Sequence, residues 1–464
     1  MTRASTQRTI LVTFAGRRDR MDLLTRYVGA AIKRGLVDEW HVWQFARDDA
    51  DRRWLRGRFP VVKATPNNGH DYFRLPAPLS LAAVRERIAF SVRAANDVHV
   101  AFKRMSGPGS SYEIVLGGWS NQLSVIRIFE DPDEIEDLER RDPLKPPDVV
   151  APTPSLLPEF GFSDVAIELG HDGLSVFFGG ALLLHNPSPV AAGDFEILYR
   201  TGYGANGDWR FGQFDDHPAR LFMTGPEAHF PPSALFYNRA YQYYVANAAI
   251  YQNDVILKCD DDIVYFDLER LADFVAFRRH NPQYFLISAN VVNNGVCAHF
   301  QQAMGAIPHD AMECELPARG MCGSLWEDGE KADALHRLFL KTPDSFRADL
   351  TPPILWNERI SINFIALLGS DLVHIPDVSP DDEHDLCYGV RKRARKQNCI
   401  YPPFVAAHLS FWKQDAKMQI ASTLEGYRAL ANRIAPTSPG GENNSSKGSW
   451  NLIAKNSSSS TKRG

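Results

Sequence analysis

The sequence has no long hydrophobic run and no strong excess of either charge. No stretch approaches the ~20 apolar residues of a membrane-spanning helix, and the opening residues lack the apolar segment of a secretory signal. The formal net charge is −5, so nothing in the overall charge calls for nucleic acid as a partner. We therefore expect a cytoplasmic globular protein that does not bind nucleic acid.

Cysteine is scarce and irregularly placed. The six cysteines include no CxxC pair and all lie in the C-terminal half, at Cys259, Cys297, Cys314, Cys322, Cys387 and Cys399. This pattern favours free thiols in a reducing compartment over disulfides or a structural zinc site.

What is present is an ordinary globular composition, 44% hydrophobic and 23% charged over 464 residues, which is long enough for two or more domains. Residues 9–14 form a short apolar run typical of a buried strand, and residues 21–36 repeat apolar side chains at helical spacing. A second strand is expected over 39–46. The order strand, helix, strand predicts the start of an α/β sheet.

The middle of the chain has a different character. From about residue 71, short alternating strands such as 112–118 and 123–128 are separated by turn residues, which predicts an antiparallel sandwich or barrel. Helical and α/β patterns return after residue 214, and the tail is low in complexity. We expect an α/β domain over 1–70 and 214–434, an inserted β-sandwich over 71–213 and a disordered tail over 435–464.

An acidic triplet follows an apolar strand in the segment DVILKCDDDIVYFD, residues 254–267. Side chains alternate in an extended chain, so Asp260 and Asp262 point one way and Asp261 the other. Mg²⁺ and Mn²⁺ prefer oxygen ligands, and such an ion neutralises charge on a departing diphosphate. We predict that Asp260 and Asp262 are metal ligands; the alternative is a solvated turn or helix cap.

These residues carry a resemblance to glycosyltransferases of the GT-A fold, whose DxD motif matches residues 260–262. The string LKCDDDIVYFD is similar to the L-K-x-D-D-D-(I/V) pattern of galactosyltransferase-like families. The resemblance spans about 8–65 and 215–430 and implies an α/β, GT-A-like (Rossmann-like) domain interrupted by the β-sandwich. It further implies transfer, with Mn²⁺ or Mg²⁺, from a nucleotide sugar to a glycan or lipid-linked glycan acceptor in surface polysaccharide biosynthesis, UDP-sugars being the favoured donors.

The resemblance also implies a base and a third metal ligand. In inverting enzymes of this fold an acidic motif with the base precedes a metal-binding histidine by about 25 residues. Here 408 − 382 = 26 residues separate Asp382 from His408. We predict Asp382 as the base, with Asp381 and Glu383 as neighbouring candidates, and His408 as a metal ligand. The alternatives are acids that cap a helix, a core histidine, and a retaining enzyme in which the acidic motif binds the acceptor.

The segment 354–372 is predicted to be an amphipathic helix, followed by a strand over 370–377. Glu358 near the start of that helix is a rival base, an acceptor contact, or a first-turn carboxylate favoured by the helix dipole. Asn290, Asn293 and Asn294 are candidates for binding sugar hydroxyls, although asparagine more often forms turns.

Donor contacts are expected where the first two strands end. The candidates are Thr13, Ala15, Arg17, Arg18, Asp48 and Asp261, and the alternative is ordinary loop polarity. The basic run at residues 391–396 suits a phosphate contact, a solvated face, or a peripheral contact with anionic lipid at the inner membrane face.

The strings YEIVLGGWSNQLSVIRI (112–128) and YRTGYGANGDWRFG (199–212) resemble the farnesoic-acid methyltransferase-type β-sandwich domain over about 85–213. This region has no glycine-rich turn suited to S-adenosylmethionine, so methyl transfer is not inferred. Aromatic side chains stack well on sugar rings. Trp119, Asn121, Arg127 and Trp209 are the candidate sugar contacts, and the alternative is that the tryptophans belong to the core.

Two other functions compete with glycosyl transfer. The first is a non-catalytic glycan-binding protein that acts through the β-sandwich. The second is a metal-dependent phosphotransferase or nuclease, which the absence of a GxxxxGK[ST] loop and of a second acidic cluster disfavours.

Overall fold

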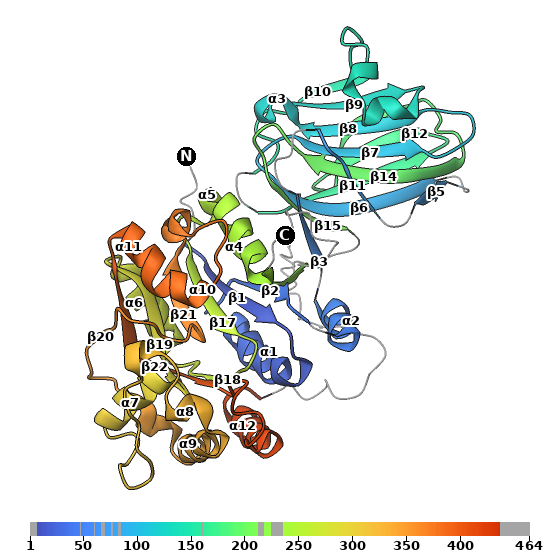
Figure 1. Ribbon diagram of the computed structural model, residues 1–464. Coiled ribbons are helices and arrows are strands. Elements are labelled where there is room, and N and C mark those ends of the chain that lie inside the picture. Colours follow the sequence, from blue (N-terminus) through green and yellow to red (C-terminus); the bar gives the residue numbers. More distant parts are fainter. Residues whose placement is uncertain are drawn as a thin grey trace, which may run out of the picture.

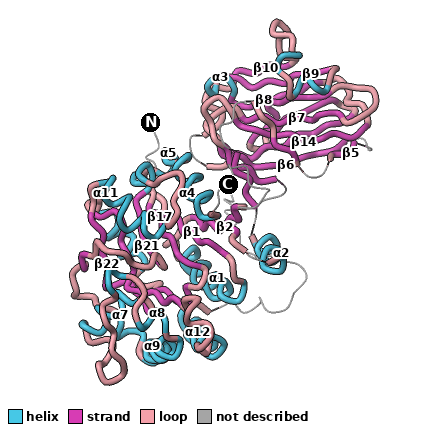
Figure 2. The backbone as a smooth tube through the Cα atoms, in the orientation of Figure 1, coloured by secondary structure: helices cyan, strands magenta, loops and turns pink. Residues whose placement is uncertain are grey.

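The computed structural model describes residues 7–46, 48–59, 61–65, 70–75, 78–81, 85–158, 161–211, 218–223 and 235–436. The predicted disordered tail lies outside these residues, apart from its first two. The protein has an α/β half and a β-sandwich (Figure 1). Figure 2 shows that the sandwich is built almost entirely from strands, whereas helices surround the strands of the other half.

The α/β half is centred on a group of parallel strands. They are β1 (Thr9–Ala15), β2 (Glu39–Gln44), β16 (Ala219–Phe222), β3 (Val61–Thr65) and β17 (Val255–Asp260). Strand β1 lies between β2 and β17, β16 follows β2, and β3 follows β16, each pair being parallel. Most residues of β1 and β17 are buried, as expected for parallel strands covered on both faces.

Antiparallel pairing extends this sheet beyond β17. The additional strands are β21 (Phe364–Leu368), β19 (Tyr284–Val292), β22 (Gln397–His408), β18 (Ile263–Phe266) and the short β20 (Ile354–Leu355). Strand β21 runs antiparallel to β17 and β19, and β19 pairs in parallel with β22. Strand β18 then returns antiparallel to β22, which brings the acidic turn after β17 close to the end of β22.

Helices cover this sheet (Figure 1). They are α1 (Arg18–Lys33), α2 (Asp49–Arg58), α4 (Phe236–Ala246), α5 (Ala248–Tyr251), α6 (Leu271–His280), α7 (Gly295–Ala303), α8 (Ser324–Glu327), α9 (Gly329–Lys341), α10 (Asp382–His384), α11 (Arg391–Ala394) and α12 (Ile420–Ile434). The predicted apolar face of α1 is buried, including Leu24, Tyr27 and Val28. No helix in the described part of the chain is long and apolar enough to cross a bilayer.

The sandwich has two facing sheets. One contains β4 (Phe73–Arg74), β5 (Leu79–Leu81), β7 (Val98–Arg104), β8 (Ser111–Gly117), β9 (Leu123–Phe129), β10 (Val149–Pro152) and β14 (Gly193–Thr201). The other contains β6 (Arg85–Arg93), β11 (Ser163–Gly170), β12 (Gly173–Phe178), β13 (Ala181–Asn186) and β15 (Gly207–Phe211). Alternating side chains from both sheets form one apolar core, as the strand pattern predicted.

The sandwich and the α/β half share one continuous sheet. Strand β15 pairs antiparallel with β6 on one side and with β3 on the other, which completes a 15-stranded sheet. At this junction Arg93 forms a buried ion pair with Asp208, and the hydroxyl of Tyr243 donates to the same carboxylate at 2.7 Å. Because Tyr243 belongs to α4, this network joins the two halves.

The structure confirms a mixed α/β architecture with a β-sandwich; assignment to the GT-A fold stays a prediction. The helix predicted over 354–372 is wrong, because this segment contains β20, a loop and β21. Residues 364–366 are fully buried between β17 and β19, and a short apolar run does not distinguish a buried strand from a helix. The strand predicted over 370–377 is also wrong, since Gly369–His374 is a 3-10 helix.

Candidate functional site

The acidic triplet lies at the turn between β17 and β18, as the sequence indicates. Asp260 is the last residue of β17, and His408 is the last residue of β22, where it pairs with Ile263. One ligand atom each from Asp260, Asp262 and His408 lie within 4.8 Å of one another. The structure therefore brings together the three predicted metal ligands.

Asp262 is the most enclosed member of this cluster. Its Oδ1 lies 3.2 Å from Nε2 of His408, and its Oδ2 lies 2.9 Å from Nη2 of Arg17 and 3.3 Å from Nη1 of Arg20. Burial would raise the pKa of Asp262, but His408, Arg17 and Arg20 together lower it below the usual aspartate range. Asp262 is therefore ionised at neutral pH.

The donor set fits a divalent cation. Oδ1 of Asp262 is buried, and no described residue donates to it with good hydrogen-bond geometry, although Nε2 of His408 lies 3.2 Å away. A buried carboxylate oxygen without a donor is costly unless something else satisfies it. Two carboxylates and one imidazole are ligands that Mn²⁺ accepts and that Mg²⁺ accepts in part, since it prefers oxygen.

Asp260 is held by groups that the sequence analysis did not identify. Lys258 forms an ion pair with its Oδ1, and Nδ2 of Asn363 donates to its Oδ2 at 3.0 Å. Nδ2 of Asn294 in turn donates to Oδ1 of Asn363 at 3.2 Å. A lysine inside the apolar run VILKC is the one sequence signal for this arrangement, because an isolated lysine is rarely buried without a partner.

Asp261 is not part of the metal-ligand cluster; it lies in the turn after β17 and binds the turn after β1. Its Oδ2 accepts hydrogen bonds from the backbone N–H of Gly16 at 2.7 Å and of Arg17 at 2.9 Å. Its other oxygen pairs with the Arg17 guanidinium. Asp261 thus positions Arg17, whose side chain is 44% exposed beside the cluster.

The other predicted donor contacts are placed less favourably. Thr13 is fully buried, and its hydroxyl lies 3.2 Å from Sγ of Cys259 and accepts from the indole of Trp40. Ala15 is also buried, whereas Arg18 is exposed. Asp48 caps α2 by accepting from the backbone N–H of Asp51. The structure gives Thr13 and Asp48 packing and capping roles because their oxygens already have partners.

The three acids of the second motif have separate environments. The guanidinium of Arg359 binds both Asp381 and Glu383. Asp381 also caps α10 by accepting from the backbone N–H of His384 at 3.0 Å, so the capping alternative is correct for this residue. Asp382 is left apart from that ion-pair network.

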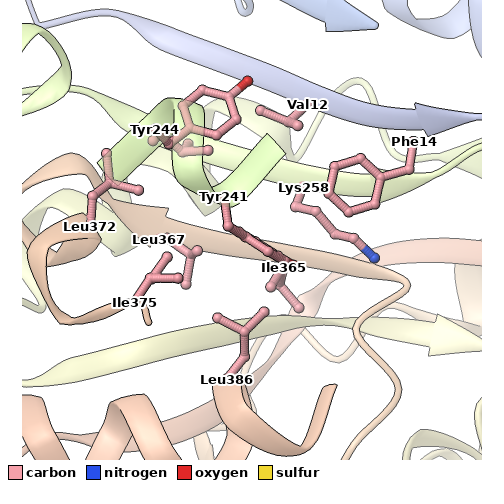
Figure 3. Close-up of a pocket in the computed structure, with 11 residues that line it drawn as sticks. Val12, Phe14, Tyr241, Tyr244, Lys258, Ile365, Leu367, Leu372, Ile375 and Leu386 are labelled. Atoms are coloured by element: carbon pink, nitrogen blue, oxygen red, sulfur yellow. The ribbon is translucent and has the colours of Figure 1, made fainter. Parts of the chain in front are cut away.

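Two side chains, Tyr241 and Lys258, connect Asp382 with the metal-ligand cluster. The hydroxyl of Tyr241 donates to Oδ2 of Asp382 at 2.9 Å. Burial raises the pKa of Asp382; Lys258 and Tyr241 oppose this rise, and the charge of Asp260 adds to it. Tyr241 and Lys258 line the same small apolar pocket, together with Phe14 (Figure 3). Tyr241 thus reaches Asp382, and Lys258 reaches Asp260, from one pocket.

The predicted acceptor contacts are not gathered around this pocket. Glu358 is exposed in a loop, where it accepts from the hydroxyl of Tyr388, and not in the first turn of a helix. Asn293 is fully buried against Leu409 and Gln414. Asn294 caps α7. Asn293 therefore has the turn role that the sequence left as the alternative, whereas Asn294 is a helix cap and Asn290 is buried in β19, where its side chain donates to the carbonyl of Phe346.

Part of the basic run is used inside the fold. Lys396 forms an ion pair with Asp371, and Nε of Arg393 donates to the carbonyl of His374. These contacts attach α11 to the neighbouring 3-10 helix.

In the sandwich, only one of the predicted aromatic contacts faces solvent. Trp209 is fully buried and its Nε1 donates to Thr65, so its prediction as a sugar contact is wrong and it belongs to the core. The Asn121 side chain donates to the carbonyl of Leu157 and accepts from its N–H, so it holds two loops together. Trp119 is 49% exposed, with the Arg127 guanidinium 5.6 Å from its ring.

Comparison with protein families finds a similarity for the sandwich. Residues 66–211 match the family model described as "Farnesoic acid 0-methyl transferase". No curated protein matches the chain. Because the family match falls on the sandwich alone, the chemistry of the acidic cluster has to be argued from its own geometry.

Among solved structures the likeness is weak. The carbohydrate-binding module CBM66 from Bacillus subtilis is 10% identical, over 32% of this chain and 83% of that one, with a TM-score of 0.22. Sheep galectin-11 is 10% identical over 32% and 96%, with a TM-score of 0.20. A prokaryotic β-1,3-1,4-glucanase from a mouse hindgut metagenome is 8% identical over 33% and 86%, with a TM-score of 0.23.

Proposed function

We propose that the α/β half is a GT-A-type, metal-dependent glycosyltransferase that moves a sugar from a nucleotide sugar to a glycan acceptor. The observation that carries this proposal is the cluster of Asp260, Asp262 and His408 at the end of β17. The similarity of the DxD string to that fold supports it. UDP-sugars are the first donors to test. In this proposal the product is a surface polysaccharide, and the protein is cytoplasmic and peripheral to the membrane.

The cluster supplies the metal site of this proposal. Asp260, Asp262 and His408 would hold Mn²⁺ or Mg²⁺, which neutralises charge on a departing nucleoside diphosphate when bound. Arg17 adds a second positive charge beside the cluster, and Asp261 orients it. The Arg17 side chain is 44% exposed, and a guanidinium suits planar contact with phosphate oxygens.

Asp382 is the base of this proposal. Burial raises the pKa of Asp382, and a carboxylate with a raised pKa is a better proton acceptor than an ordinary aspartate. Tyr241 fixes its Oδ2, which leaves Oδ1 as the oxygen to take the proton of an acceptor hydroxyl. This assignment requires inversion at the anomeric carbon, because a positioned base activates the acceptor for direct displacement.

The experiment is a panel of nucleotide sugars with candidate oligosaccharide acceptors, scored by release of nucleoside diphosphate with Mn²⁺ and with a chelator. We expect turnover of one donor by the wild type and by Asp273→Asn, a control in which a half-exposed carboxylate on α6 is removed. Asp262→Asn should be inactive. Turnover that survives the chelator or Asp262→Asn, or no turnover of any donor by the folded protein, would contradict the proposal.

A second candidate function is glycan binding by the β-sandwich without catalysis. Trp119 favours it, because a large aromatic side chain that stays half exposed offers an apolar surface on which a sugar ring can stack. This function predicts retention of oligosaccharides by the protein with no consumption of any nucleotide sugar.

A further inference from the structure

Three adjacent strands of the seven-stranded sheet present their connections at one end of the sandwich. Val98 at the start of β7 pairs with Leu116 near the end of β8 and with Thr201 at the end of β14. Trp119 follows β8 and Tyr203 follows β14, so both side chains lie at this end. Trp119 is 49% exposed and Tyr203 is 55% exposed.

A strained turn presents Trp119. Trp119, Ser120 and Asn121 have φ values of 53°, 57° and 62°, in the left-handed region that costs a non-glycine residue about 1–2 kcal/mol. Both Asn121 hydrogen bonds to Leu157 hold the turn in place. The strained backbone is not explained by burial of the indole, which stays half exposed. Strained backbone held in place by its surroundings is concentrated at ligand sites.

The outer face of the sheet between the two aromatics carries a row of charged groups. Glu113 of β8 is fully buried and binds Arg127 of β9 at 3.1 Å. Nδ1 of His99 on β7 lies 3.2 Å from Glu113 and 3.1 Å from the guanidinium of Arg200 on β14. This network fixes Arg127 near Trp119 and Arg200 near Tyr203, with ring distances of 5.6 Å in both cases.

The floor between the aromatics also holds an unsatisfied polar atom. Nε2 of His99 is buried and has no hydrogen-bond partner among the described residues; the nearest carboxylate oxygen, Oδ1 of Asp97, is 3.9 Å away. Buried ring nitrogens are normally satisfied, if not by protein then by water or a ligand. Asp97 itself has a φ of 50° and burial raises its pKa to about 6.

We propose that this end of the sandwich binds a sugar ring of a glycan, with Trp119 and Tyr203 contacting its apolar faces and Arg127 and Asp97 binding its hydroxyls. Adjacent strands are about 4.8 Å apart, so the ends of β8 and β14, on either side of β7, from which the two aromatic loops depart, are roughly 10 Å apart. The inference rests on the second candidate function and names its site; it does not depend on glycosyl transfer.

The charges on this face argue against other ligands. Arginine guanidiniums already lie against both aromatics, so a quaternary ammonium or other cation would meet repulsion. The fully buried Glu113 offsets part of the positive charge, which weakens the attraction for a simple anion. A ring with both apolar faces and hydroxyl groups uses the aromatic and the polar groups together.

The test uses the full-length protein, without nucleotide sugar, on a printed array of neutral and uronic-acid oligosaccharides. The strongest binder is then titrated calorimetrically against wild type, Trp119→Ala, Tyr203→Ala and Arg127→Lys, which keeps a positive charge beside Glu113. Leu182→Ala is the matched control, because Leu182 is 58% exposed on β13 of the opposite sheet. We expect each of the first two variants to lose affinity by at least about 5-fold and the control to match wild type.

Two results would overturn the inference, and they differ in meaning. If the wild type binds an oligosaccharide and both aromatic variants bind it equally, the site is elsewhere while glycan binding by the protein stands. If the wild type, with a cooperative unfolding transition, binds nothing on the array, the second candidate function fails together with the site. Because no donor is present, neither result depends on the acidic cluster of the α/β half.

Discussion

Nε2 of His408 lies 3.2 Å from Oδ1 of Asp262, although His408 ends β22 and Asp262 lies in the remote turn between β17 and β18. The pairing of His408 with Ile263 fixes this distance, because Ile263 directly follows Asp262. The backbone N–H of Leu409 also donates to the carbonyl of Asp262 at 2.9 Å. Strand register therefore positions the two predicted ligands, which is more precise than placement by a loop.

Removal of this imidazole should weaken metal binding. For His408→Ala we expect the affinity for Mn²⁺, measured by calorimetry, to fall by at least about 10-fold, since one of three protein ligands is lost. His384→Ala is the control, because His384 is an exposed histidine. Equal Mn²⁺ affinity in wild type and His408→Ala would remove His408 from the site.

Asp382→Asn should separate catalysis from binding. The amide oxygen still accepts from Tyr241, so the fold is preserved, but no carboxylate remains to take a proton. We expect kcat to fall about 10²- to 10⁴-fold with Mn²⁺ affinity unchanged. Asp381→Asn is the comparison: it loses charge pairing with Arg359 and should chiefly lower stability. A normal kcat for Asp382→Asn would exclude Asp382 as the base.

Glu113 should make the sandwich sensitive to acid. Burial would raise its pKa, but hydrogen bonding with His99 and the charges of Arg141 and Arg127 lower it well below the usual range. A depressed folded-state pKa gives stabilisation that is complete above the unfolded value of about 4.3 and is lost as pH falls through the folded value.

We expect Glu113→Gln to be less stable than wild type by about 3–5 kcal/mol at pH 7, because two arginines lose their buried partner. The difference should shrink as the pH falls below about 4. Urea unfolding at several pH values measures it. A difference that does not change with pH would contradict the assignment of the charge to Glu113.

The junction between the two halves should also depend on one carboxylate. Asp208→Asn leaves Arg93 buried without its ion-pair partner, which should cost about 3–5 kcal/mol of unfolding free energy. Urea unfolding followed by fluorescence is the measurement, with Asp172→Asn on the exposed turn after β11 as the control. Equal stability of the two variants would show that the Arg93–Asp208 pair is dispensable.

Thiol reactivity offers a check on the fold. All six cysteines are free, and only Cys322 is exposed. Burial raises the pKa of the Cys297 and Cys387 thiols to about 12, which suppresses the reactive thiolate. We expect a thiol reagent to modify one cysteine in the native protein and six after denaturation. Rapid modification of a second cysteine would contradict this burial.

The sequence predicts those features whose signal is local. The strand that ends at Asp260 and the apolar face of α1 follow from patterns of a few residues, and both are observed. The helix prediction for residues 354–372 failed because the apolar spacing in ISINFIALL suits a helix and a strand alike. Pairing with the neighbouring strands β17 and β19 makes part of this segment a strand.

The site itself was only partly accessible from sequence. Asp260, Asp262 and His408 followed from a motif, whereas Asn363 and Tyr241 act through tertiary contacts that no local pattern marks. Exposure was equally hidden. Trp119 and Trp209 were both predicted as sugar contacts, yet one is half exposed and the other is in the core. The row that joins His99, Glu113 and Arg200 depends on strand register.

The hydrogen-bonded continuity of the sheet through β6, β15 and β3 has a mechanical consequence. A binding domain on a flexible linker would only raise the local concentration of its ligand near the rest of the protein. Here the backbone ladder and the Arg93–Asp208 pair resist bending, so the separation between Trp119 and Asp262 is set by the fold. A glycan that touched both points would have to span that separation.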